Sequence, residues 1–427
     1  MPSIKDHPLR YTLANELHAR PFPSLDAPCF AAYLAIKPEH DAANRDRDAD
    51  RAHLIALLDR FGTAHPQPGA THFFGEIGKY SLKWESHTEF VTYTIFGAGI
   101  AARAFDPVRF DVFPEDWLQQ APGVRMTSAL IRVEPFNHSS EISEKLNEWF
   151  VPESVAVSQV LDKTALIAGD FRIDTTGHMR FAVFTSPETG ARRIGRIVQR
   201  LCEIETYKAM SMLGLTRARQ LSNDLGPIDQ RLTRLVGAMT GEMSLPETTL
   251  KDLLAISAEL ENMAAKSSFR FGATGAYEAI VNQRIAVLRE ERFEGRQTFG
   301  EFMMRRYDPA MRTVKSAERQ LAGMADRAIR AGDLLRTQVD VERSAQNQKL
   351  LESMDKRAAL QLHLQKTVEG LSVVAISYYA VNLAAYIAYP FTDPLGVSKG
   401  MATAVLTPLV VLMVWLLVRR IRRSMEH

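Results

Sequence analysis

The sequence predicts an α+β cytoplasmic head with a mixed or antiparallel sheet and helices, followed by a long-helix stalk and a C-terminal two-helix transmembrane hairpin. Three observations lead to this fold class. Short apolar, β-branched runs punctuated by Gly and Pro fill the chain up to about Pro187. Helix breakers become rare after Glu188, and two apolar runs almost free of charge lie near the C-terminus.

Composition limits the classes of protein to which the chain can belong. It has 427 residues, of which 46% are hydrophobic and 24% charged, so an ordinary globular core is expected in roughly two or three structural units. The formal net charge is only +2, which gives no basic field for nucleic acid. Cys29 and Cys202 are too few and too far apart for a disulfide framework, and we expect both to be buried as small hydrophobic residues.

The head, residues 1–187, is predicted to mix strands and helices. A helix over 48–61 presents apolar residues on one face and stops at Gly62. A shorter helix is expected over 141–150, and the turn 174–178 closes a hairpin. The expected strands cover residues 29–36, 81–96, 127–133, 165–173 and 179–184.

The second region, residues 188–366, is predicted to be a helical stalk. Breaks between helices are expected at 225–227, which reads Leu-Gly-Pro, and at 267–275, which carries two glycines. The last helix should begin near Pro309 and run toward the membrane. Its irregular apolar stripe between Leu334 and Ala358 is typical of coiled-coil packing, so we expect the stalk to oligomerise.

The transmembrane hairpin, residues 367–418, is predicted to have spans at 368–389 and about 398–418, each close to the length that crosses a bilayer. Only Lys399 lies in the connection, and the basic tail 419–427 follows the second span. The positive-inside rule therefore places both termini in the cytoplasm, with the hairpin in the inner membrane. The N-terminus has no apolar run of the kind that forms a signal peptide, which agrees with this orientation.

A polar stripe marks the first span. Tyr378, Asn382, Tyr386 and Tyr389 are spaced i, i+4, i+8 and i+11, so they share one side of a helix. Polar groups in a membrane helix normally face protein or water. One interpretation is a contact face, within the hairpin or between copies of the chain. The other is the lining of a pore or ion path.

Residues 83–89 form the most suggestive segment of the head. Alternation along a strand would place Lys83, Glu85, His87 and Glu89 on one face, with Leu82, Trp84 and Phe90 on the other. A histidine between two carboxylates could bind a divalent cation or perform general acid–base chemistry. The alternative is an ordinary solvated strand face. A divalent cation is the one candidate ligand of this kind, and no other cofactor is predicted.

Polar residues are also dense near the N-terminus. They could approach His72 and the Glu85 face in space, or they could pair with one another on the surface of a short helix. The chain contains no phosphate-binding Walker loop, no G-x-S-x-G, no H-E-x-x-H and no C-x-x-C. The N-terminal candidates are His7, Arg10, Asn15, Glu16, His18 and Arg20.

Four runs together resemble a bacterial family of predicted membrane-anchored proteins with a domain of unknown function. They are HPLR at 7–10, NELHARP at 15–21, LKWESHTEF at 82–90 and KTVEGLSVVAISYY at 366–379. This resemblance covers nearly the whole chain but implies no activity. The order of head, long helices and two spans also resembles CorA-like divalent cation channels, although Ala388-Tyr389-Pro390 stands where that family has Gly-Met-Asn.

The leading hypothesis is a membrane-anchored protein that binds a ligand or partner through its head and forms homo-oligomers through its stalk. The bilayer is its first partner, nucleic acid is not expected, and the sequence names no partner or small molecule for the head. A CorA-like channel, with the polar stripe facing a pore, is the first alternative. A tethered metal-dependent enzyme that uses Glu85, His87 and Glu89 is the second.

Overall fold

The computed structural model describes residues 4–16, 22–136, 138–239, 246–392 and 398–425. The chain forms two compact units. The first comprises Met1–Met243 and Lys251–Ala331, and the second comprises Ser244–Leu250 and Gly332–His427. The first unit contains the sheet and its covering helices, and the second contains the two most apolar helical segments.

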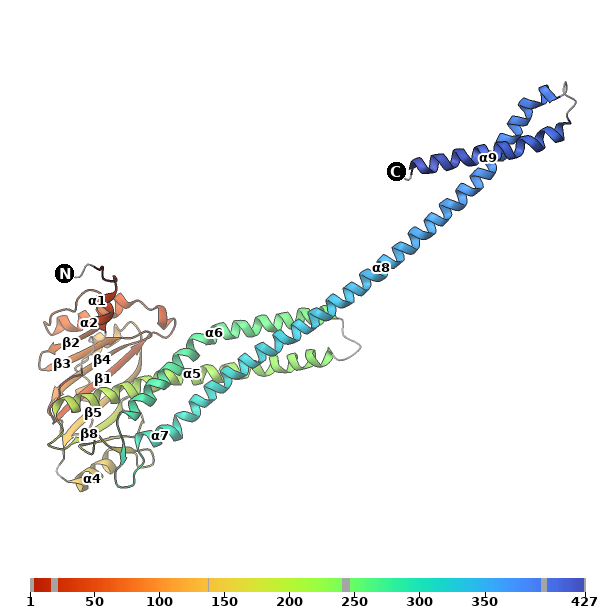
Figure 1. Cartoon of the computed structure of the whole chain (residues 1–427). Coiled ribbons are helices and arrows are strands. Elements are labelled where there is room, and N and C mark those ends of the chain that lie inside the picture. The colour runs from red at the N-terminus through yellow and green to blue at the C-terminus, as the bar shows by residue number, and fades with distance from the viewer. Residues whose placement is uncertain (1–3, 17–21, 137, 240–245, 393–397, 426–427) are drawn as a thin grey trace. The chain divides into compact units, whose positions relative to one another are not determined.

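Within the described residues, nine strands of the first unit form one mixed sheet in the order β2-β3-β4-β1-β5-β8-β7-β6-β9 (Figure 1). All neighbouring strands are antiparallel except β5 and β8, which run parallel. The predicted class of sheet is therefore confirmed as mixed. The strands are β1 (Cys29–Lys37), β2 (His72–Ile77), β3 (Tyr80–Ser86), β4 (Val91–Ala98), β5 (Val124–Pro135), β6 (Ala156–Val160), β7 (Ala165–Gly169), β8 (Met179–Thr185) and β9 (Glu291–Arg292).

Both faces of the sheet centre are covered, as strand β1 shows. Ala32, Leu34 and Ile36 belong to a buried core that includes Leu54 of α2 and Trp117 of α3. The alternate residues face α5, which packs against β1, β5 and β8. Burial of each large apolar side chain in such a core contributes roughly 1.5–3 kcal/mol. The helices on the core side are α2 (Arg47–Arg60), α3 (Glu115–Gln119) and α4 (Ser139–Trp149).

Helix α2 shows how local chemistry sets the ends of an element. The Asp46 carboxylate accepts hydrogen bonds from the backbone amides of Asp48 and Ala49, at 2.8 and 3.2 Å, and so caps the first turn. Gly62 has φ of +62°, just beyond the last turn. The predicted stop at Gly62 is confirmed.

The predicted breaks inside the long helices were wrong. Helix α5 (Ala191–Ala238) continues through Pro227, and α6 (Pro246–Ala286) continues through 267–275. A proline inside a helix costs about 3 kcal/mol, and a glycine about 1 kcal/mol relative to alanine. Burial of Leu225 and Ile228 beside Pro227, and of Phe271 within the second segment, offsets these costs. Tertiary packing therefore overrides the local propensity.

The run 81–96, predicted as one strand, is a hairpin of two strands. Ser86 pairs with Val91, and the His87 amide donates to the Phe90 carbonyl at 2.9 Å. The four residues between the strands, 87–90, contain neither glycine nor proline, so no local turn signal marks the bend. Strands β2 and β6 were also missed, and β2 adds an outer strand beside β3.

Helix α7 (Phe299–Arg306) precedes α8 (Asp308–Thr392), whose start confirms the boundary predicted near Pro309. Helix α9 (Lys399–Met425) is the last element. The second unit joins the start of α6 to α8 through an ion pair between Glu247 and Arg343, at 2.7 Å. The remaining elements are the short helix α1 (Arg10–Glu16) and two 3-10 turns at Ala42–Asn44 and Pro107–Arg109.

Candidate functional site

A cavity of about 220 Å³ lies between the sheet and helix α5 in the first unit. Strands β1, β3 and β4 form its floor, α5 forms one wall, and Arg284 enters from α6. The sheet places Lys83 and Glu85 in this cavity because Leu82 and Trp84, at alternate positions, are buried in the core on the opposite face. The lining residues are Phe22, Tyr33, Lys83, Glu85, His87, Phe90, Thr92, Thr94, Phe96, Gln199, Cys202, Glu203, Thr206, Tyr207 and Arg284.

Charged groups in this pocket form a continuous network. The Lys83 ammonium lies 3.3 Å from a Glu85 carboxylate oxygen and donates to the Gln199 amide oxygen at 2.8 Å. The Gln199 amide nitrogen in turn donates to Glu203 at 2.8 Å. Arg284 forms an ion pair with the other oxygen of Glu203. Two cations and two carboxylates therefore balance across the cavity, which lowers the cost of holding charges away from bulk water.

Beside this network, β1 and α5 also carry groups that stay neutral. The Tyr33 hydroxyl contacts the Thr206 hydroxyl, and Thr206 donates to the Cys202 carbonyl at 2.8 Å. Burial raises the pKa of Tyr33 and of the Cys202 thiol well above their usual ranges. A thiol held in this form is a poor nucleophile. Cys29 is also buried, with its pKa raised to about 12 by burial, so both cysteines lie in the interior as predicted.

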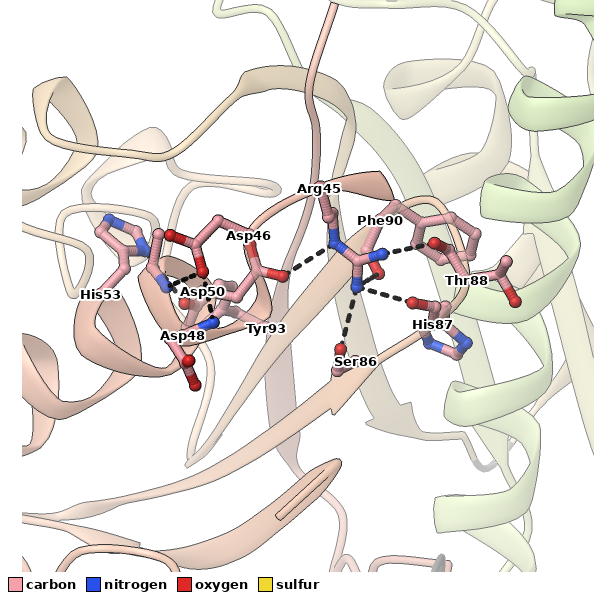
Figure 2. Close-up of polar contacts among 11 residues, drawn as sticks. Arg45, Asp46, Asp48, Asp50, His53, Ser86, His87, Thr88, Phe90 and Tyr93 are labelled. Carbon is pink, nitrogen blue, oxygen red and sulfur yellow. Dashed lines mark hydrogen bonds and ion pairs between the residues drawn. The ribbon is translucent and has the colours of Figure 1, made fainter. Parts of the chain in front are cut away.

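Arg45 fixes the turn that carries His87 into the pocket wall (Figure 2). Its guanidinium pairs with Asp50 at 2.8 Å and donates to the Ser86 hydroxyl at 2.9 Å. Its terminal nitrogens also donate to three carbonyls of the turn. Nη1 donates to Thr88, and Nη2 donates to His87 and Phe90. The Arg45 side chain is only 3% exposed. A buried arginine thus supplies donors to the carbonyls of this turn.

Glu89 holds the same turn from the other side. Its carboxylate is fully buried and pairs with both terminal nitrogens of Arg270 on α6. The Tyr277 hydroxyl donates to Glu89 at 2.9 Å. Burial and the neighbouring carboxylate raise the pKa of Tyr277, so this phenol remains a donor. Charge-assisted hydrogen bonds of this kind are the stronger class, and here they join the sheet to α6.

The structure divides the three residues that were predicted to share a metal-binding face. Glu85 and His87 line the pocket, whereas Glu89 points into its own pair with Arg270 and Tyr277. The alternation failed because the strand ends at Ser86, and the turn also brings Phe90 to the pocket side. In the described part of the chain, no group of three or more His, Cys, Asp or Glu side chains could hold a metal ion.

The N-terminal polar residues are placed only in part. His7 accepts a hydrogen bond from the Leu9 amide, and Arg10 pairs with Asp6, so both make local contacts. Asn15 and Glu16 belong to α1, and His18 and Arg20 lie outside the described residues. His72 lies directly across from Glu85 on β2, and its buried Nδ1 has no hydrogen-bond partner among the described residues.

Sequence reasoning missed the residues that complete the site from afar. Gln199, Glu203 and Arg284 lie more than a hundred positions beyond Lys83 in the chain, and no local pattern links them. Arg45 and Arg270 were also missed. The sequence carries no local signal for them, because the turn at 87–90 that Arg45 and Glu89 hold contains neither glycine nor proline.

The polar stripe of the first predicted span is largely exposed. Tyr378, Asn382 and Tyr386 are exposed, and only Tyr389 is half-buried, with its hydroxyl 3.5 Å from that of Thr403 on α9. Among the described residues of the two predicted spans, the buried positions are instead Ser377 and Ala385 on α8 and Val414 on α9. By length and composition, two helices of the described chain could cross a membrane: one within Phe299–Phe391 and one within Lys399–Ile421.

Comparison with known proteins gives a family and no activity. A search of curated proteins finds no match to this chain. A family model described as "Protein of unknown function (DUF3422)" matches residues 5–425. That match includes the pocket, the turn at 87–90 and both apolar helices. The chain therefore belongs to the DUF3422 family.

Proposed function

We propose that this protein is a membrane-anchored cytoplasmic binding protein whose head holds a small zwitterion in the pocket beneath α5. The observation that carries the proposal is the charge-balanced network of Lys83, Glu85, Glu203 and Arg284 in one cavity. A zwitterion the size of an amino acid offers a carboxylate to the cations and an ammonium group to the carboxylates. The aromatic rings beside them, Phe90 and Tyr207, suit an apolar portion of the ligand.

Thermal unfolding of the full chain in detergent tests ligand binding, with the standard amino acids and glycine betaine as probes. A ligand that binds only the folded state raises the unfolding midpoint by mass action. We expect one or more probes to do so in the wild type but not in Arg284→Gln, which removes a cation of the pocket. Arg289→Gln is the matched control, because Arg289 pairs with Asp162 and does not line the pocket. A shift of equal size in both variants would place the ligand elsewhere.

The membrane anchor rests on the two apolar helices and on the distribution of charge around them. Arg419 and Arg420 follow the apolar stretch of α9, and Lys399 is the one basic residue between 390 and 400. This asymmetry supports a cytoplasmic C-terminus by the positive-inside rule. A C-terminal green fluorescent protein fusion should therefore fluoresce in the membrane fraction and resist carbonate extraction. Release by carbonate would contradict an integral anchor.

A channel is the second candidate, and the exposure of Tyr378, Asn382 and Tyr386 favours it. Such a stripe could line a central path if several copies assembled around an axis. Under this hypothesis Asn382→Leu abolishes cation flux into liposomes while the mass of the assembly stays the same. Unchanged flux would reject the channel.

A further inference from the structure

A second hollow, of about 920 Å³, opens on the other face of the sheet from the pocket described above. Its floor is made by Arg132 and Glu134 of β5 and by Arg180 of β8. Because alternate residues of a strand lie on one face, these three side chains share the face of Leu130 and Ala182, which belong to the core beneath α2, α3 and α4. The walls are the segment after β4, the end of α4 and residues 172–176. No residue is shared between the two linings.

The floor carries more cations than carboxylates. Glu134, which is 4% exposed, pairs with both Arg132 and Lys145. Asp170, which is 1% exposed, pairs with Arg180 at 2.7 Å. Three cations therefore share two buried carboxylates. Like charges gathered in a partly desolvated floor repel one another, and an added anion would relieve this repulsion.

Several guanidinium N–H groups around the hollow have no acidic acceptor. Arg180 Nε is buried without a hydrogen-bond partner among the described residues. At the rim, Arg172 donates to the Ser154 hydroxyl at 2.9 Å. Within the described chain neither Arg172 nor the exposed Arg103 forms an ion pair. Buried donors are normally satisfied, so an unsatisfied N–H in a hollow points to a missing acceptor.

The two remaining acids of the hollow reduce this excess but do not remove it, because with Glu134 and Asp170 they make four carboxylates against five cations. Glu148 is exposed at the end of α4. One oxygen of Asp174 already accepts from the Thr176 and His178 amides, at 2.9 and 3.0 Å, and from the Thr176 hydroxyl. That carboxylate is therefore engaged in closing its own turn.

Aromatic rings hold the cations of the floor in place. The Arg132 guanidinium lies 5.3 Å from the centre of the Trp149 ring, and the Lys145 ammonium lies 5.7 Å from it. The Arg180 guanidinium lies 5.7 Å from the centre of Phe150. Such contacts orient cations at little entropic cost before any ligand arrives.

We propose that this hollow is a binding site for a small anion with two or more carboxylate or phosphate groups. Arg132 and Arg180 in the floor and Arg103 and Arg172 at the rim would hold it. Guanidinium groups fit both acids because their planar fork donates two parallel hydrogen bonds. The proposal does not depend on the function assigned to the pocket beneath α5.

The test is thermal unfolding of the full chain in detergent, titrated with citrate and with pyrophosphate at constant ionic strength and pH. We expect a saturable rise in the unfolding midpoint with at least one of the two anions. In Arg103→Gln/Arg172→Gln the apparent dissociation constant should rise on the order of tenfold for each arginine removed. Both side chains are exposed at the rim, so the fold should persist. Arg312→Gln, at an exposed arginine of α8 outside the hollow, is the matched control.

Two results would overturn the proposal: no saturable shift with either anion, or the same dissociation constant in the rim variant and the control. Arg180→Lys keeps a cation for Asp170 but removes the unpaired Nε–H, and it should also weaken binding.

Repeating the titration in nanodiscs identifies the source of the anion. A site for a free anion gives the same constant in anionic and zwitterionic lipid, whereas a site for a lipid headgroup shows competition in anionic lipid alone.

Discussion

Arg45 shows how one side chain can replace a local turn signal. The turn at 87–90 has no glycine, and its carbonyls are instead satisfied by a buried guanidinium that also pairs with Asp50 (Figure 2). The sequence could not reveal this arrangement, because Arg45 lies about forty positions away and looks like part of a charged helix start. By contrast, Lys83 and Glu85 were placed on one face correctly, since strand alternation is local and Leu82 and Trp84 fix the register.

Replacement of Arg45 should destabilise the head strongly. Arg45→Ala leaves Asp50 buried without its counter-ion and removes the guanidinium donors from the His87 and Thr88 carbonyls, so we expect a loss of about 3–5 kcal/mol in the free energy of unfolding. The neighbouring Arg47→Ala, at an exposed position with no hydrogen bond from its side chain among the described residues, should change it by less than about 0.5 kcal/mol. Urea unfolding measures both, and similar midpoints for the two variants would show that Arg45 does not hold the turn.

His53 should make stability depend on pH. Its Nε2 lies 3.0 Å from the Trp117 carbonyl, which can only accept, so Nε2 carries the proton and Nδ1 accepts from the Tyr93 hydroxyl at 3.0 Å. Burial lowers the pKa of His53 from 6.5, and the same holds for His178, where Arg125 adds to the effect. The unfolded chain therefore binds more protons than the folded chain once the pH falls below about 6.5.

Above about pH 6.5, the contribution of these two histidines to the free energy of unfolding should not change with pH. Below that pH it should decline by up to about 1.4 kcal/mol per pH unit for each histidine. His53→Gln keeps a donor for the Trp117 carbonyl but cannot titrate, so its slope should be shallower, with His178 supplying the rest. Unfolding curves collected across this range test the prediction. An equal slope in the variant would mean that folding does not lower the pKa of His53.

At the scale of elements, the long helices show where local propensity loses to packing. Helix α5 was predicted to break at 225–227 and does not, because its apolar face is buried on both sides of Pro227. Glycine has two different roles along this helix. A Cβ on Gly195 would stand 1.7 Å from the Pro23 carbonyl oxygen, whereas one on Gly226 would have no atom within 4 Å.

These two glycines make a matched pair for mutation. Gly195→Ala should lower the free energy of unfolding by about 1–3 kcal/mol, since the backbone of residues 23–25 must move away from α5. Gly226→Ala, in the same helix at an exposed position, should raise it by roughly 0.5–1 kcal/mol through helix propensity. Thermal unfolding of both variants provides the measurement. A gain in stability at position 195 would contradict the close approach of the two backbones.

At the scale of the whole molecule, the sequence predicted a head, a long helical region and two apolar helices, and each of these is present. Coarse organisation is predictable because it follows from hydrophobic patterning and chain breakers, which are local. The candidate sites were only partly predictable, because both hollows are completed by residues that the topology brings together, such as Arg284 in one and Arg180 in the other.

Self-association is the prediction that belongs to this scale. As the alternative to a pore lining, we propose that the stripe is a contact face in which Asn382, exposed on α8, meets a second copy of the chain, because lipid tails offer no partner for its amide. Light scattering with correction for detergent should then give a lower mass for Asn382→Leu than for the wild type. Thr407→Leu is the control, because the Thr407 hydroxyl already donates to the Thr403 carbonyl of its own helix at 2.7 Å. Unchanged mass in Asn382→Leu would leave the stripe without a role in assembly.

The burial of Cys29 and Cys202 has a practical consequence for spectroscopy. Both thiols are 3% exposed and remain protonated, so thiol-reactive dyes and spin labels should leave them unmodified while the protein is folded. The natural cysteines therefore need not be removed before a label is attached elsewhere, because they do not react with it. A single cysteine introduced at an exposed position, such as Thr88→Cys beside the pocket, would report ligand-driven movement of the 87–90 turn through its label alone.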